Sequence, residues 1–185
     1  MRRNLGVKPA LYPMPVFILA TYNDDGTPNA MTAAWGGISE ENEVTICISE
    51  DHQTTFNIEK RNAFSINIGD ADHGKECDYL GIVSGKSVPD KVKRAGFTVT
   101  ESEFLDAPII NELGFAVECR LKSWEPKRCR LVGEIVNVSV DEAICTDGKV
   151  DLSKLRPITY DSINKSYNVI GEKVGNAYRD GLEIK

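Results

Sequence analysis

The sequence predicts an antiparallel β-barrel with short helices inserted between its strands. Six or so short segments carry strand patterns, either alternating polar and apolar residues or apolar runs rich in β-branched and aromatic residues. Helical segments interrupt these strands instead of following each one, which excludes a doubly wound parallel sheet. No G-x-G-x-x-G motif follows a strand either. An antiparallel barrel fits this order of elements best.

The first half of the chain supplies four strands and one helix. The strands are expected over residues 15–22, 28–37, 43–49 and 63–68. The Asp25-Gly26 turn joins the first two in a hairpin. A helical stretch over residues 54–61 separates the last two, and Asp51 or a hydroxyl just after it is expected to cap the start of this helix.

The second half begins with a predicted helix over residues 75–83 and a short basic helical segment over residues 88–95. Extended segments follow at residues 97–100, 107–110, 114–125 and 130–140. The last two alternate over a long run and are predicted to pair as a long hairpin. After Asp141 the alternation fades, and glycines and tyrosines dominate the tail.

Composition excludes several classes of protein. The net charge of −6 argues against a nucleic-acid-binding surface. The apolar run after the first arginines is short and broken by Lys8, Pro9 and Pro13, so neither a signal peptide nor a membrane span is expected. Five cysteines without C-x-x-C or metal-ligand spacing are typical of free thiols in a reducing cytoplasm. With only two histidines, no metal site is expected.

Residues 28–37 suit the bed of a flat, polar-edged ring that carries a phosphate tail. Their small side chains let a ligand approach the backbone, and Trp35 adds a flat apolar face. The alternative is a buried strand that leads into a Gly-Gly bulge. Three hydroxyls lie near the start of the helix at 54–61, at Ser49, Thr54 and Thr55, where free N–H groups favour an anion. The alternative for these hydroxyls is helix capping without a ligand.

Four blocks of residues then identify a family. They are NAMTAAW at 29–35, TT and NI at 54–58 leading into FSIN at 64–67, DYLG at 78–81 with SGK at 84–86 and DK at 90–91, and LVGEI at 131–135. In this order they make the chain similar to the flavin reductase-like family, the FMN-binding split-barrel proteins that include flavoredoxin-type members. The resemblance covers residues 15–141 and extends into the tyrosine-rich tail.

This resemblance implies a single domain over residues 1–185, a homodimeric, Greek-key-like antiparallel split β-barrel with FMN near the dimer interface. The tail from about residue 142 would wrap the barrel or the dimer mate. The residues implied to bind FMN are Asn29, Met31, Thr32, Ala33, Ala34 and Trp35 along the ring and ribityl chain, and Ser49, Thr54, Thr55 and Lys86 at the phosphate. Tyr167 would cover the flavin or cross to the mate. No catalytic residue is expected, because the cofactor carries the reaction.

One position departs from the family pattern. Many relatives carry a histidine five residues before the glycine of the last block, and here that residue is Arg128. The arginine could hold a nicotinamide phosphate or stabilise reduced flavin, or it could be a solvated charge at a hairpin turn. His52 similarly could contact the phosphate or the ring edge, or face solvent. Cys77 could exchange electrons with the flavin, although a buried thiol is the commoner case.

Three functions therefore remain open. The first is an FMN-dependent oxidoreductase that takes hydride from NADH or NADPH and passes electrons to a flavin or another acceptor. The second is an FMN-bound carrier that exchanges electrons with a redox partner protein and turns over nicotinamide poorly. The third is a barrel that binds another planar ligand without redox turnover. The first two differ in nicotinamide oxidation, and the third predicts no yellow flavin chromophore.

Overall fold

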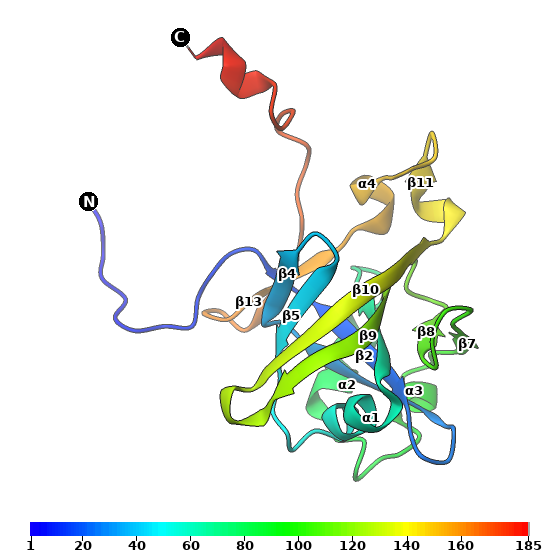
Figure 1. The fold of residues 1–185 in the computed structure, drawn as a ribbon. Coiled ribbons are helices and arrows are strands. Elements are labelled where there is room, and N and C mark those ends of the chain that lie inside the picture. Colours follow the sequence, from blue (N-terminus) through cyan, green and yellow to red (C-terminus); the bar gives the residue numbers. More distant parts are fainter. Residues whose placement is uncertain (185) are drawn as a thin grey trace.

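A seven-stranded antiparallel sheet forms the centre of the computed structural model, which describes residues 1–184 (Figure 1). Its strand order is β3-β2-β6-β9-β10-β5-β4. The strands are β2 (Phe17–Tyr22), β3 (Pro28–Ala33), β4 (Gly36–Glu40), β5 (Glu43–Cys47), β6 (Ala63–Ile68), β9 (Phe115–Glu125) and β10 (Arg130–Val140). The long hairpin predicted from the sequence is the β9–β10 pair, and its prediction is confirmed.

The sheet is curled because its two edge strands are joined by only two residues. β3 and β4 lie at opposite edges, yet Ala34 and Trp35 alone connect them. Seven flat strands would separate these edges by about 29 Å, whereas such a link spans roughly 11 Å. The sheet therefore bends until its edges approach, and Cys47 N–H donates to Trp35 O at 2.8 Å near this junction. The predicted class, a mainly β split barrel with short inserted helices, is confirmed.

Four helices lie outside the barrel: α1 (Gln53–Arg61), α2 (Gly74–Ile82), α3 (Lys91–Arg94) and α4 (Leu152–Leu155). Helix α1 contacts β2, β3 and β6, while α2 and α3 contact β3. The strand β2 is buried on both faces. Phe17 and Leu19 belong to the core inside the barrel, and Ile18 and Ala20 belong to the core under α2 and α3. Burial of both faces explains why its sequence is an unbroken apolar run.

Smaller elements complete the chain. β1 (Met14–Pro15), β13 (Ile158–Asp161) and β14 (Ser166–Val169) form a three-stranded sheet. β7 (Val99–Glu101) pairs with β8 (Pro108–Ile110), and β11 (Cys145–Thr146) pairs with β12 (Lys149–Val150). Three short 3-10 turns cover Pro126–Arg128, Glu142–Ile144 and Asp180–Glu183. Residues 171–184 lead away from the barrel and are exposed throughout (Figure 1).

Two local predictions were wrong. The stretch 28–37 is not one strand, since β3 ends at Ala33 and β4 begins at Gly36 beside a different partner. The predicted Gly-Gly bulge is absent from this stretch: Gly36 and Gly37 pair regularly, and the register shift lies between Ile38 and Glu40. Glycine is needed at 36 for another reason, because a Cβ there would lie 2.6 Å from Thr45 O.

The start of α1 also differs from the prediction. Its N-cap residue is His52, and within residues 1–184 no side chain caps the helix by a hydrogen bond. Asp51 lies one residue too early, and its own N–H contacts Ser49 Oγ at 3.3 Å. The hydroxyls that were candidates for capping are used elsewhere in the structure.

Candidate functional site

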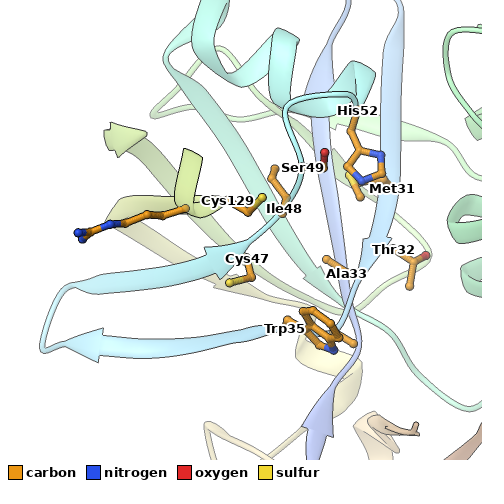
Figure 2. Close-up of a pocket in the computed structure, with 11 residues that line it drawn as sticks. Met31, Thr32, Ala33, Trp35, Cys47, Ile48, Ser49, His52 and Cys129 are labelled. Atoms are coloured by element: carbon orange, nitrogen blue, oxygen red, sulfur yellow. The ribbon is translucent and has the colours of Figure 1, made fainter. Parts of the chain in front are cut away.

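A cavity of about 530 Å³ opens at the junction where the barrel edges meet (Figure 2). Four segments supply its wall: the end of β3, the link to β4, the segment after β5 and the β9–β10 turn. The lining residues are Met31, Thr32, Ala33, Ala34, Trp35, Cys47, Ile48, Ser49, His52, Arg128 and Cys129. Six of the eleven residues predicted from the sequence, Met31, Thr32, Ala33, Ala34, Trp35 and Ser49, thus line one cavity.

One end of the cavity is flat and largely apolar. Figure 2 shows Trp35 there, next to Ala33 on the strand that forms the floor. The Trp35 side chain is 54% exposed, so its ring face is accessible to a ligand. The Thr32 hydroxyl donates to Cys77 O in α2, which ties this strand to the helix behind it. Such a surface suits the face of a planar ring.

The other end of the cavity is a helix start. His52 and Ser49 lie there, and His52 N–H contacts Ser49 O at 3.4 Å (Figure 2). The first helical bond of α1 runs from Phe56 N–H to His52 O, at 3.3 Å. The N–H groups of Gln53 and Thr54 therefore have no carbonyl partner four residues back in the helix, and the first turn holds no acidic residue. This end carries the positive helix dipole and favours an anion.

Three of the predicted residues lie behind the cavity wall. Asn29, Thr54 and Thr55 are at least 98% buried. Asn29 Nδ2 donates to Thr54 Oγ1 at 2.8 Å and so joins β3 to α1. Thr55 Oγ1 donates to Ser49 O at 2.7 Å and fixes the segment that enters the helix. In this structure the two threonine hydroxyls position the helix start, and its backbone N–H groups are the donors that remain for a ligand.

The loop after α2 packs closely against Asn29 and the start of α1. A Cβ at Gly85 would lie 2.2 Å from Asn29 Oδ1 and 3.4 Å from Gln53 Cβ, so a side chain would fill the space between loop and helix. Asn29 Oδ1 is buried and has no hydrogen-bond partner within the described residues. Glycine at 85 therefore lets the loop that carries Lys86 approach the start of α1.

Two lysines place positive charge near this end. Lys86 is exposed and lies beside the cavity rather than on its wall. Lys91 is buried, and its Nζ donates to Leu80 O at 3.0 Å and Val83 O at 2.7 Å, which closes the C-terminus of α2. Burial lowers the pKa of Lys91 to about 8. Both lysine charges also lower the pKa of His52, after the larger effect of its partial burial.

A second cavity, of about 320 Å³, adjoins the first at the end of β3. It shares Thr32, Ala33 and Ala34 with the first and is also lined by Tyr167. The Tyr167 hydroxyl donates to Asp78 Oδ1 at 2.9 Å, and burial and this carboxylate raise the pKa of the phenol. The sequence-predicted Tyr167 therefore lines the neighbouring cavity and not the one that contains Trp35 and His52.

The residues that sequence reasoning missed come from pairing between distant strands. Cys47 lies opposite Arg130 in the β5–β10 register, and Ile48 N–H donates to Cys129 O at 3.0 Å. Arg128 does line the cavity, and its Nη1 lies 3.5 Å from Glu125 Oε2, which is compatible with ligand binding and with a solvated charge at the turn. Cys77 is fully buried, and burial raises its thiol pKa to about 12, which argues against electron exchange with a ligand in the cavity.

The model of the flavin reductase-like domain matches residues 10–156 of this chain. The chain belongs to the flavin reductase-like family. The flavoredoxin of Desulfovibrio vulgaris (Miyazaki F) is 33% identical, with a TM-score of 0.93 over 98% of this chain and 100% of that one. Flavoredoxin from Methanosarcina acetivorans is 28% identical, with a TM-score of 0.85 over 97% and 98% of the two chains.

Two uncharacterized proteins are also similar to this chain. The uncharacterized Bacillus subtilis protein YdfE is 24% identical, over 96% of this chain and 95% of its own length. An uncharacterized Aeropyrum pernix protein is 28% identical over 113 residues, which span 60% of this chain and 43% of that protein. Across the described residues, no helix has the length and apolar character needed to cross a membrane.

Proposed function

We propose that this flavin reductase-like protein is an FMN-dependent oxidoreductase. It would take hydride from NADH or NADPH and pass the electrons to a flavin or another acceptor. The observation that carries the proposal is the two-ended cavity, with a flat apolar surface at Trp35 and a helix start without a side-chain cap at His52. Family membership supports flavin as the planar ligand.

The donor set of the cavity fits FMN. The apolar floor of Met31–Ala34 and the exposed Trp35 ring suit the isoalloxazine, and the helix start with Ser49 suits a phosphate. A volume of about 530 Å³ lies within the range of small-molecule sites. Among the solved structures similar to this chain, one is described as an FMN-binding domain from Shewanella baltica, at 19% identity and a TM-score of 0.78, which bears on the fold.

When bound, FMN would supply the two-electron chemistry. The residues of this chain would bind and orient it: the α1 N–H groups and Ser49 would hold the phosphate, and Trp35 would fix the plane of the ring. Thr54 and Thr55 act through the helix they position. Arg128, a lining residue with an exposed side chain, would hold a nicotinamide phosphate. No acid, base or nucleophile is required of the protein.

We also propose that the protein works as a homodimer. Apolar side chains lie unprotected on the segment after residue 170: Val174, Tyr178 and Leu182 are 102%, 100% and 80% exposed. A second copy would cover these residues and remove their apolar surface from water. The tail would then reach the dimer mate. Five cysteines without disulfides support a reducing cytoplasm as its location.

A flavoredoxin-like electron carrier is the second candidate, favoured by the 33% identity to the Desulfovibrio vulgaris flavoredoxin over nearly the whole chain. It would exchange electrons with a protein partner and oxidise nicotinamide slowly. Anaerobic absorption spectra separate the candidates. Flavin bands that bleach with NADH or NADPH support the reductase, and bands that bleach only with dithionite support the carrier. If FMN does not bind, both are wrong, and another planar ligand becomes the better proposal.

A further inference from the structure

His52 has an unusual position for a helix N-cap residue. Its backbone takes the extended conformation that precedes α1, at φ −78° and ψ 139°, but its side chain makes no capping hydrogen bond within the described chain. The imidazole instead lines the cavity, close to Ser49 (Figure 2). An imidazole at this place is directed at whatever binds to the free N–H groups of the helix start.

The charges that act on His52 come from three segments. Asp51 precedes it in the chain, Lys86 lies in the loop after α2, and Lys91 lies in α3. Arg128 also lines the cavity, with its Nη1 3.5 Å from Glu125 Oε2. Partial burial lowers the pKa of His52, the two lysines lower it further, and Asp51 opposes them. Without an anion these effects favour the neutral form of the imidazole.

We propose that His52 binds the terminal phosphate of the mononucleotide and takes up a proton from solvent when that phosphate arrives. This inference rests on the proposed function, because FMN is the ligand. The phosphate brings up to two negative charges beside the imidazole and offsets the charges of Lys86 and Lys91, which favours the protonated ring. The proton moves from solvent to a ring nitrogen, and no electron is transferred.

Proton uptake makes binding depend on pH and on the phosphate. FMN should bind more tightly as the pH falls from 8 to 6.5, by up to about tenfold per pH unit. Below about pH 6 the phosphate itself gains a proton, and the gain ends. Riboflavin has the same ring and no phosphate, so its affinity should not follow this trend.

The test is a fluorescence titration of apoprotein with FMN and with riboflavin between pH 6.5 and 8. His52→Gln keeps a neutral hydrogen-bonding side chain, and we expect it to weaken FMN binding roughly tenfold to a hundredfold at pH 6.5 and much less at pH 8. His73→Gln is the matched control. His73 pairs with Asp70 at 2.9 Å and packs on Phe97, away from the cavity, so this variant should keep the wild-type slope.

Calorimetry in two buffers of different ionisation enthalpy gives a second readout. FMN binding at pH 7 should take up a fraction of a proton in the wild type and in His73→Gln, and clearly less in His52→Gln. Equal proton uptake and equal pH slopes in wild type and His52→Gln would overturn the inference. Absence of FMN binding in the wild type would instead overturn the proposed function, so the two failures are distinguishable.

Discussion

The backbone nitrogen of Cys47 lies 2.8 Å from the carbonyl oxygen of Trp35, and this hydrogen bond holds the link between the two edge strands against the end of β5. Trp35 is in the link between β3 and β4, and Cys47 ends β5. The link that joins the two edge strands is thus also part of the cavity wall, because both residues line the cavity. Changes that open this junction should reduce stability and ligand binding together.

Substitution of Gly36 by alanine tests this junction. The new Cβ would lie 2.6 Å from Thr45 O, so β4 must move away from β5. We expect a loss of about 1–3 kcal/mol in the free energy of unfolding, measured by urea denaturation of the apoprotein. Gly37→Ala is the control, since the described residues place no atom within 4 Å of a Cβ there. Equal effects of both variants would contradict the prediction.

The Asn29–Thr54 bond supports the helix start and can be measured by a double-mutant cycle. Asn29→Ala removes the donor and Thr54→Val removes the acceptor of a buried 2.8 Å hydrogen bond. Each single change should cost about 1–3 kcal/mol, because it leaves a buried polar group unpaired. The two losses should not add, and the expected coupling is 0.5 kcal/mol or more. Additive losses would show that the bond does not join β3 to α1.

Thiol reactivity should separate four of the five cysteines by burial. Cys47 and Cys129 are exposed and line the cavity, whereas burial raises the pKa values of Cys77 and Cys119 to about 12. Iodoacetamide at pH 8, followed by mass spectrometry, should therefore modify the first two and spare the buried pair until the protein unfolds. Saturating FMN should slow modification at Cys47 and Cys129. Unchanged rates with bound FMN would place the ligand elsewhere.

Lys91 should make stability depend on pH. Burial lowers its folded-state pKa to about 8, below the unfolded value of about 10.4. Between these values the unfolded chain binds more protons, so the contribution of Lys91 to stability rises from pH 8 to 10, with a total of roughly 3 kcal/mol. The difference in unfolding free energy between wild type and Lys91→Met should grow over this interval. Lys93→Met, at an exposed position, should show no such growth.

The sequence predicts most elements because their signals are local. β2 is buried on both faces, so its apolar run is sufficient evidence of a strand. The alternating residues of β9 and β10 likewise predict their hairpin. A strand pattern does not reveal where the chain leaves one neighbouring strand and begins to pair with another. The break at Ala34 and Trp35, between β3 beside β2 and β4 beside β5, was therefore missed.

The site is predicted less completely, because its remaining parts depend on contacts between distant segments. Cys47 and Cys129 meet only through the register of β5 and β10. Residue type indicates that Thr54 and Thr55 can bind phosphate, but the packing of α1 against the barrel buries both side chains. Lys86, likewise, lies beside the cavity and acts there through its charge.

A crystal structure of the protein with bound FMN tests the central proposal most directly. We predict the isoalloxazine ring over residues 31–35 with its plane against Trp35, and the phosphate at Ser49, His52 and the first N–H groups of α1. Flavin density at another surface, or a phosphate far from α1, would contradict the site proposed for this protein.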